Sequence, residues 1–240
     1  MRVVSLVPSV SETLIGWGVT PIAVTRFCEQ PGLPTVGGTK DPDVDAIAAL
    51  APDLVVLCEE ENRVEDAERL AAGGLALHTV TLRAVADVGP ELDRLARVVG
   101  IDPEPLAEIA PDTGTARLRA FVPIWRRPWM TLNHDTYGSS LLASLGVANV
   151  FADEPDRYPT TDLAAAASRS PDVVLAPSEP YPFKERHRGE LEAEVAPVVF
   201  VDGQDLFWWG IRTPEARRRL ERVLAVKLRR SAFGDRQTPR

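Results

Sequence analysis

The 240-residue sequence predicts an α/β protein of two similar lobes, each a parallel-type sheet flanked by helices, joined by a single connecting helix. Apolar runs typical of strands alternate with helix-like runs, which is the pattern of parallel sheets covered by helices. In addition, "DAIAALAPDLVVL" (45–57) resembles "DLAAAASRSPDVVL" (162–175), and "SETLIGWGV" (11–19) resembles "SSLLASLGV" (139–147). Because both matches occur in the same order, we expect each half of the chain to form one lobe.

Each half is expected to alternate strands with helices. In the first half we expect strands at 3–7, 22–25, 54–57 and 76–80, and helices at 11–17, 44–50 and 63–72. In the second half we expect strands at 129–132, 173–176 and 198–201, and helices at 137–145, 163–168 and 214–228.

A helix is predicted over residues 84–100, between the two halves. Its apolar residues recur at helical spacing: Val88, Leu92, Leu95, Val98 and Val99. Prolines at positions 103, 105 and 111 interrupt any long continuation. The expected domains are therefore an N-terminal lobe (1–83), a connecting helix with linker (84–117) and a C-terminal lobe (118–240).

Composition narrows the class of protein. With 45% apolar and 26% charged residues the chain is typical of soluble globular proteins, and its net charge of −8 argues against a nucleic-acid surface. No run approaches the roughly 18 apolar residues of a membrane span. The first expected strand begins directly after Met1, so the sequence as given predicts a cytoplasmic protein, or a periplasmic or extracellular membrane-associated one if an export signal precedes it. Cys28 and Cys58 are interpreted as free thiols, and a disulfide stays open for an exported protein.

Candidate binding residues follow the strands, because ligands of open parallel sheets bind beyond the carboxyl ends of the strands. The loops in question contain "VPSVSETL", then Phe27 and Cys28, then "VGGTKDPDVD" and "CEEENRVED". Helix capping by Ser9 or Ser11 and a solvated run of glutamates are the alternative interpretations. In the second half, four of the five tryptophans lie in "IWRRPW" and "FWW". Such rings suit a broad, flat, partly apolar ligand, or they pack against the sheet edge or between lobes.

Catalysis is not expected. "NHDTYGSS" contains His134, Asp135 and Ser139, but neighbours in sequence seldom supply triad geometry and no G-x-S-x-G motif is present. We expect no resident metal, and His134 as a metal ligand is the less favoured alternative. His187, in "KERHRGE", is expected to be solvated.

Four stretches carry a resemblance to a known family: "RVVSLVPSVSETL", "VGGTKDPDVDAIAALAPDLVVL", "WMTLNHDTYGSSLLASLGVANVF" and "SPDVVLAPSEP". Across roughly residues 2–228 the chain resembles the helical-backbone substrate-binding proteins of ABC importers. The cobalamin-binding branch is nearest, and siderophore and haem binders are relatives. The resemblance implies two α/β lobes joined by one long helix, with a ligand held in the cleft between them and no chemistry.

The resemblance also implies roles for particular residues. Cys58 stands at a cleft position where the cobalamin binders have tryptophan, and Trp208 or Trp209 stands where the family has an aromatic residue. Glu65 and Glu185 are the implied docking residues for an ABC permease.

Together these arguments predict a non-catalytic, monomeric binder of a large, flat, metal-containing molecule, with cobalamin or another corrinoid first and no cofactor required. The alternative is a cytoplasmic binder or sensor of haem, a siderophore or a related tetrapyrrole. The expected apolar walls are Trp125, Trp129, Tyr137, Phe207, Trp208 and Trp209, and Phe27 and Cys58 are further expected ligand-binding residues. The expected polar contacts are Ser9, Glu12, Lys40, Glu59, Asn62, Asn133 and Gln204.

Overall fold

The computed structural model describes residues 1–30, 32–107, 109 and 116–234, with the side chains of 226–234 excepted. The chain divides into two compact units. Among the described residues, unit 1 comprises 1–82, 87–107 and 209–212, and unit 2 comprises 83–86, 109, 116–208 and 213–234. The fold is α/β, as the sequence predicts.

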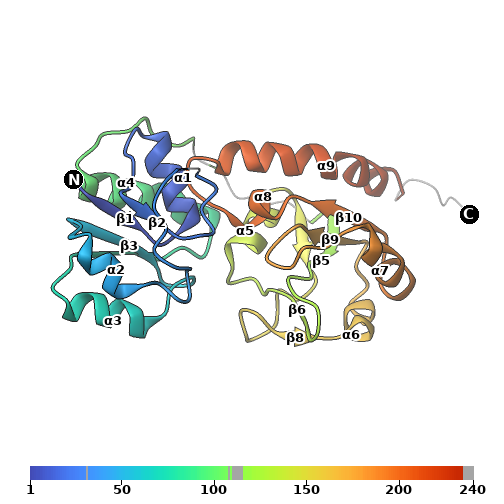
Figure 1. Ribbon diagram of the computed structural model, residues 1–240. Coiled ribbons are helices and arrows are strands. Elements are labelled where there is room, and N and C mark those ends of the chain that lie inside the picture. Colours follow the sequence, from blue (N-terminus) through green and yellow to red (C-terminus); the bar gives the residue numbers. More distant parts are fainter. Residues whose placement is uncertain (31, 108, 110–115, 235–240) are drawn as a thin grey trace, which may run out of the picture. The chain divides into compact units, whose positions relative to one another are not determined.

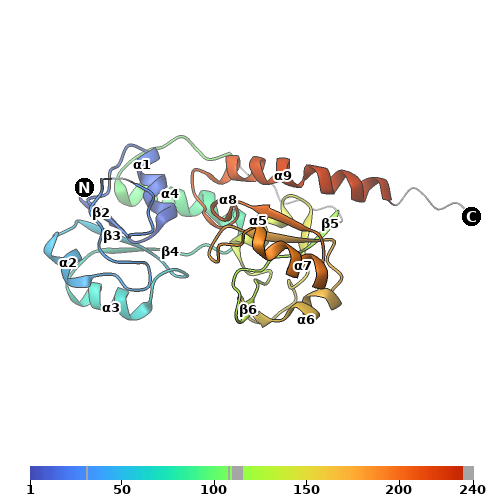
Figure 2. The same cartoon turned by 45° about the vertical axis from the view of Figure 1, so that its right-hand side comes forward.

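Unit 1 is built on a four-stranded parallel sheet in the order β2 (Ala23–Val24), β1 (Val3–Ser5), β3 (Leu54–Cys58), β4 (Leu77–Val80). Its helices are α1 (Pro8–Gly16), α2 (Val44–Ala49), α3 (Val64–Ala72) and α4 (Val88–Val99). The short 3-10 turn η1 (Val85–Asp87) precedes α4, and its first two residues belong to unit 2. Helices α1 and α4 lie on one face of the sheet, and α2 and α3 on the other (Figures 1 and 2). The buried strands are almost wholly apolar, as expected for a parallel sheet covered on both faces.

Unit 2 has a second four-stranded parallel sheet in the order β10 (Val198–Val201), β9 (Val173–Pro177), β5 (Leu118–Phe121), β7 (Val147–Asn149). Its helices are α5 (Tyr137–Ala143), α6 (Leu163–Ser168), α7 (Arg188–Glu194) with the preceding turn η2 (Glu185–His187), α8 (Gly203–Phe207) and α9 (Thr213–Gly234). A small antiparallel pair, β6 (Trp129–Met130) with β8 (Thr160–Thr161), completes the unit (Figure 1).

The two units share one topology. If β1, β2, β3 and β4 are matched in chain order to β5, β7, β9 and β10, the two sheets have the same strand order. The matched segments include both repeats detected in the sequence, α1 with α5 and the α2–β3 segment with the α6–β9 segment. Internal duplication therefore explains the fold.

The amino end of each sheet carries the same arginine motif. In unit 1 the Arg2 N–H donates to the Asp53 carboxylate at 2.6 Å, and its guanidinium donates to the carbonyl oxygens of Ala51 and Leu50 at 3.4 and 2.7 Å. These carbonyls lie at the end of α2, where the helix leaves acceptors without an internal partner. Arg2 thus ties the end of α2 to the neighbouring strands, and Ala51 makes the turn with φ of 44°.

Unit 2 repeats this motif atom for atom. The Arg119 N–H donates to the Asp172 carboxylate at 2.7 Å, and its guanidinium donates to the carbonyl oxygens of Ser170 and Arg169 at 3.3 and 2.7 Å. Ser170, like Ala51, has a left-handed backbone, with φ of 51°.

The sequence analysis misplaced one strand of unit 2 and missed another. The expected strand at 129–132 is only the two-residue β6, which pairs antiparallel with β8 outside the main sheet. The sheet position belongs to β5, whose four residues include Arg119, and the short β7 was not anticipated. Arg119 interrupts the apolar run of β5, and β7 has only three residues, so neither shows a clear apolar pattern.

The connecting role of the helix at 84–100 stays a prediction. The helix itself is present as α4, which ends at Val99, is capped by Gly100 and packs against β4 within unit 1. Residues 108 and 110–115 of the expected linker lie outside the described residues. In the described part of the chain no helix has the length and apolarity needed to cross a membrane.

Candidate functional site

A chain of buried hydroxyl groups and the half-buried Cys28 thiol lies at the carboxyl edge of the unit 1 sheet. Ser11 Oγ lies 2.9 Å from Ser5 Oγ and 3.1 Å from Cys28 Sγ, and Thr25 Oγ1 lies 3.4 Å from the same sulfur. Ser11 therefore binds strand ends and does not cap its helix. Helix α1 begins with Pro8 at its first position after Val7, which supplies no side-chain cap, so the capping interpretation was wrong.

Asn62 joins three loops at this edge. Its Oδ1 accepts the Cys58 N–H at 2.7 Å, and its Nδ2 donates to the carbonyl oxygens of Leu6 at 3.3 Å and Thr39 at 2.9 Å. Both amide protons of this buried residue are therefore used inside unit 1. Asn62 therefore holds these loops together at the edge of the sheet.

Cys58 is buried at the end of β3. Burial, with a smaller contribution from the nearby Glu61 charge, raises the pKa of the Cys58 thiol to about 12. A thiol that stays protonated is neither a nucleophile nor a good metal ligand. The buried, uncharged Cys58 thiol suits the apolar contact with a ligand that the sequence suggests. Cys28 and Cys58 are both free thiols.

The exposed rim of unit 1 carries one aromatic ring among charges. The Phe27 side chain is 51% exposed, and the Arg26 guanidinium lies over its ring at 4.9 Å while binding Asp41 through two hydrogen bonds of 3.0 and 2.9 Å. Lys40 Nζ donates to the Glu60 carbonyl oxygen at 2.7 Å. Glu59 is exposed at the start of the same loop. This rim offers an apolar face beside polar groups.

Residues 209–212 form a strap across α1 in unit 1, although the segments on both sides of them belong to unit 2. The Trp209 N–H donates to Ser9 Oγ at 3.3 Å, and the Ile211 N–H donates to Thr13 Oγ1 at 3.4 Å. Thr13 Oγ1 in turn donates to the Ser9 carbonyl at 2.8 Å. Ser9, expected to contact ligand, here holds the strap.

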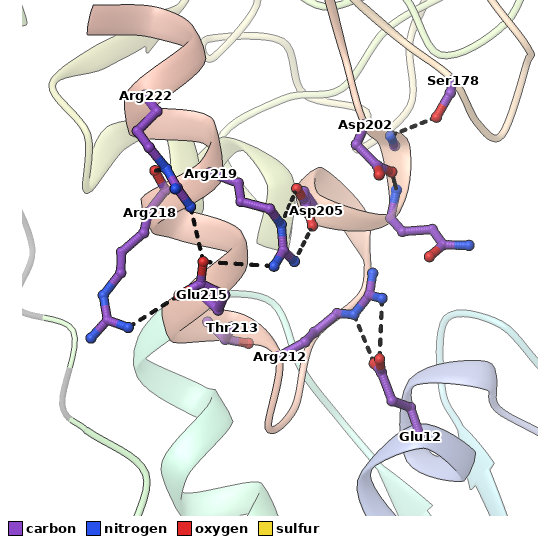
Figure 3. Close-up of polar contacts among 12 residues, drawn as sticks. Glu12, Ser178, Asp202, Asp205, Arg212, Thr213, Glu215, Arg218, Arg219 and Arg222 are labelled. Carbon is purple, nitrogen blue, oxygen red and sulfur yellow. Dashed lines mark hydrogen bonds and ion pairs between the residues drawn. The ribbon is translucent and has the colours of Figure 1, made fainter. Parts of the chain in front are cut away.

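An ion pair completes the strap. Arg212 Nε lies 2.7 Å from Glu12 Oε2, and Arg212 Nη2 donates to Glu12 Oε1 at 3.1 Å, in a largely buried position (Figure 3). Gly210 allows the close approach, since it has φ of 112° and a Cβ there would lie 2.2 Å from Thr13 Oγ1. Glu12 is thus a structural partner of Arg212, and no pattern in the sequence indicates that pairing.

In unit 2, two of the expected wall residues join a cluster of five rings, the aromatic cluster: Trp125, Trp129, Tyr181, Phe183 and His187. Trp129 stacks on Phe183 with a centroid distance of 5.9 Å and an interplanar angle of 7°. Trp125 meets Tyr181 edge to face at 5.7 Å and is 44% exposed. The cluster lies at the carboxyl ends of β5 and β9, as open α/β sheets predict for a binding surface.

His187 is the buried member of the aromatic cluster, so the expectation of a solvated side chain was wrong. Its ring is 4% exposed and accepts the Lys184 N–H at Nδ1 over 3.0 Å. Burial, then the charges of Arg186 and Arg126, lower the pKa of His187 below its ordinary value. The neutral imidazole acts here as a packing ring.

Helix α8, which ends at the first residue of the "FWW" segment, is held at its first residue and at its middle residue. The Gly203 N–H donates to Ser178 Oγ at 2.9 Å, and the buried Asp205 carboxylate receives two hydrogen bonds of 2.7 and 2.6 Å from Arg219 on α9 (Figure 3). Phe207 is half-buried against α5, where a Cβ on Gly138 would lie 3.0 Å from its ring.

The remaining candidates differ widely in exposure. Trp208 and Gln204 are half-buried, whereas Trp209 is buried with 4% of its surface exposed. Tyr137 is buried and its hydroxyl lies 3.1 Å from Thr213 Oγ1. Asn133 is buried, accepts the N–H of Asp135 at 2.8 Å and donates to a carbonyl of the 152–157 loop. These polar side chains organise loops.

Comparison with known proteins places this geometry in context. No protein-family model matches the chain. The chain is 26% identical over 199 residues to a vitamin B12-binding protein of Pectobacterium carotovorum, a match that spans 75% of the chain and 72% of that protein.

Solved structures share the whole fold. The periplasmic vitamin B12 binding protein BtuF of Vibrio cholerae superposes with a TM-score of 0.74 at 18% identity, covering 94% of this chain and 96% of that one. The periplasmic heme-binding protein BhuT, solved with two hemes, superposes with a TM-score of 0.77 at 20% identity, covering 95% and 98%. The predicted resemblance to substrate-binding proteins is confirmed.

The two docking residues that the family resemblance implies lie in matched segments of the two units. Glu65 lies in the first turn of α3, which follows β3, and Glu185 lies in the first turn of η2, which follows β9. Both are exposed, and Glu185 binds Arg188 through hydrogen bonds of 2.6 and 3.2 Å.

Sequence reasoning missed two members of the aromatic cluster, Tyr181 and Phe183. The signal for them was the "YPF" triplet (181–183) in the loop that follows β9, since the other candidate residues also lie in loops that follow strands. In the described residues no group of three or more His, Cys, Asp or Glu side chains could hold a metal ion.

Proposed function

We propose that this protein is a receptor for a cobalamin-type metal chelate, which it binds without chemistry and delivers to an ABC importer. The sequence relative is named for binding vitamin B12, and neither it nor the structural neighbours described above are named as enzymes. The neighbours are periplasmic proteins, which favours a periplasmic location and lends no support to the cytoplasmic alternative.

The observation that carries the proposal is an exposed ring at the carboxyl edge of each sheet. Phe27 and Trp125 are 51% and 44% exposed, and both lie where open parallel sheets bind ligands. A large ring system buries such surfaces at little cost in side-chain entropy.

Haem is the second candidate. The neighbour with two bound hemes favours it, as does Cys58, which replaces the tryptophan expected of the cobalamin branch. Both ligands are broad, flat chelates, so the exposed rings of Phe27 and Trp125 suit contact with either one.

Titration tests the proposal. Cyanocobalamin and ferric protoporphyrin are added separately to the purified protein while tryptophan fluorescence and heat of binding are followed. We expect cyanocobalamin to bind at micromolar concentration or below, and more tightly than the porphyrin. No binding of either ligand at that concentration would overturn the proposed function.

Two variants test whether Phe27 and Trp125 contact the ligand. Phe27→Ala and Trp125→Ala should each weaken binding by about 1–3 kcal/mol, roughly 5-fold to 150-fold. Val98→Ala and Val223→Ala are matched controls, because these apolar residues are also exposed and lie on helices away from the loops that follow the strands. The controls should leave the affinity unchanged.

Glu65 and Glu185 are the proposed permease contacts, one on each unit. In cells that depend on this protein for uptake, Glu65→Ala should reduce transport while ligand affinity in vitro is unaltered. A loss of both together would mean that Glu65 supports the binding site instead.

A further inference from the structure

We propose that His187 is a pH-dependent switch for the aromatic cluster: its neutral ring holds Tyr181 and Phe183 in place, and protonation releases both rings and weakens ligand binding. The switch is a property of unit 2 alone, whereas its effect on ligand affinity rests on the proposed function. His187 ends the turn η2, directly before α7, and is 4% exposed. A buried imidazole inside a candidate binding surface is a place where a proton can change that surface.

Both ring nitrogens of His187 face N–H groups. The Lys184 backbone N–H points at Nδ1 over 3.0 Å, and the Arg186 Nε–H points at Nε2 over 3.2 Å. A neutral imidazole has one nitrogen that accepts a hydrogen bond, and a protonated imidazole has none. Nδ1 is the acceptor, because the backbone N–H of Lys184 is fixed whereas the exposed Arg186 side chain can move. A second proton therefore has to bind at Nδ1, where it meets the Lys184 N–H.

Protonation at Nδ1 opens the turn η2. The hydrogen bond from the Lys184 N–H to the imidazole, and the one of 2.8 Å from the His187 N–H to the Lys184 carbonyl oxygen, together close this turn. Two N–H groups that point at each other repel, and each then lacks an acceptor in a partly buried position. The turn relieves this contact by moving the imidazole away from the Lys184 backbone, and with it away from the neighbouring rings.

The charges around His187 oppose its protonation. The groups that act on it are three cations and one carboxylate, namely Arg186, Arg126, Glu190 and Lys184. The carboxylate is already bound, since Glu190 Oε2 lies 2.8 Å from Arg126 Nη2. Glu185, in the same turn, binds Arg188 instead. Burial of the imidazole and the nearby cations hold the pKa of His187 below its ordinary value, so the switch operates in acid and not at neutral pH.

The imidazole supports the two rings on which the tryptophans rest. Its centroid lies 5.6 Å from the centroid of Tyr181, the other titratable side chain of the cluster, and 5.6 Å from that of Phe183. Trp125 meets the first of these rings, and Trp129 stacks on the second. Once the imidazole moves, both tryptophans lose a fixed neighbour. Because a preorganised surface binds more tightly than a mobile one, ligand affinity falls.

The other histidines of the chain lack this arrangement. His134 is exposed, and its Nδ1 lies 2.7 Å from the Ala152 carbonyl oxygen, an acceptor to which a protonated nitrogen can donate. His78 is buried in unit 1, whereas the aromatic cluster belongs to unit 2. His134→Gln is therefore the matched control, since it removes an imidazole of the same unit that can be protonated without breaking this hydrogen bond.

Nuclear magnetic resonance of the ligand-free protein tests the switch. The imidazole and indole signals are followed from pH 8.0 to 4.5, and His187→Gln identifies the imidazole signal of His187. We expect this signal to titrate with a midpoint below about 6.5, and the indole N–H signals of Trp125 and Trp129 to change with the same midpoint. The indole of Trp17, in unit 1, should not follow it. Arg186→Ala should raise the midpoint, because it removes a cation beside the ring.

Ligand titration tests the consequence for binding. Cyanocobalamin is the probe, because it has no group that titrates between pH 5.0 and 7.5. Its affinity for wild type and for His134→Gln should be at least about 5-fold weaker at pH 5.0 than at pH 7.5, whereas its affinity for His187→Gln should change by less than about 2-fold. If His187→Gln folds poorly, Arg186→Ala takes its place, and its loss of affinity should move to higher pH together with the midpoint of the imidazole signal.

Three results would overturn the inference in distinguishable ways. The switch is refuted if His187 does not titrate down to pH 4.5, or if it titrates while the indole signals of Trp125 and Trp129 stay constant. Equal affinities for cyanocobalamin at both pH values, with changed indole signals, would remove the effect on binding. Failure of cyanocobalamin to bind wild type at pH 7.5 would remove the proposed function and that effect, while the ligand-free titration still decides the switch.

Discussion

Polar side chains in the loops that follow the strands bind backbone groups in this protein. Ser9, Asn62 and Asn133 were expected to contact ligand, and each makes hydrogen bonds inside its own unit. A loop that leaves a sheet exposes N–H and C=O groups without ladder partners, and burial of these groups without a hydrogen bond is costly. Short polar side chains nearby form hydrogen bonds with these backbone groups, and the sequence alone does not show which side chains are used in this way.

Thiol reactivity tests the burial of Cys58. Because its pKa is raised to about 12, iodoacetamide at pH 8 should modify Cys58 at least 10-fold more slowly than Cys28, which is only half-buried. Mass spectrometry of time points from the native protein gives both rates. In denaturant the two rates should converge; equal rates in the native protein would contradict the buried position.

Stability should fall as pH drops through the histidine range because of His187. Its folded-state pKa is lowered, so below the ordinary value of about 6.5 the unfolded chain binds a proton that the folded chain does not. The free energy of unfolding, measured in urea at pH 7.5 and 5.5, should therefore decrease.

The variant His187→Gln should show a smaller decrease over that interval. Some decrease should remain, because the pKa of His78 is also lowered by burial. A dependence identical to that of wild type would contradict the assignment to His187.

At the scale of elements, the segments that sequence predicted best are those with a complete local signal. The α2–β3 and α6–β9 segments each combine an alanine-rich helix, a Pro-Asp turn and an apolar strand, and the structure places both as expected. The strand β5 was missed because Arg119, at its second position, breaks the apolar pattern. Its reason for being there, the capping of α6, depends on residues 50 positions away.

The matched turns give a paired prediction. Ala51 and Ser170 have φ of 44° and 51°, a region that costs non-glycine residues energy. Ala51→Gly and Ser170→Gly should each raise the free energy of unfolding by up to about 1 kcal/mol, after the greater entropy of glycine in the unfolded chain is subtracted. Ala71→Gly, inside α3, is the control and should lower it by roughly 0.5–1 kcal/mol. If all three variants lowered the free energy of unfolding, the backbone strain assigned to Ala51 and Ser170 would be contradicted.

At the scale of the whole molecule, the sequence revealed the duplication and therefore most of the fold. The strap could not be predicted, since Trp209–Arg212 contacts residues about 200 positions earlier in the chain. A contact between residues so far apart in the chain leaves no periodic pattern of apolar residues in the sequence. For the candidate site, the location at the carboxyl edges followed from the topology, whereas the aromatic cluster depended on Tyr181 and Phe183, which only the folded chain brings beside Trp125 and Trp129.

A change in the strap should therefore act at a distance in sequence. In Gly210→Ala the new Cβ would collide with Thr13 Oγ1 at a strained φ, which should lower stability by about 2–4 kcal/mol. Hydrogen exchange should speed up in α1 and leave α6 unchanged. Gly89→Ala is the control, since nothing lies within 4 Å of its Cβ position and it should be neutral or slightly stabilising. Faster exchange in α6 alone would contradict the assignment of the strap to unit 1.

The strap also sets an order of events during protein synthesis. The ribosome finishes every strand of the first sheet early, yet Ser9, Glu12 and Thr13 receive their partners only after Arg212 has been added. A chain truncated before residue 209 would therefore lack the hydrogen bonds and the ion pair that the strap makes with α1.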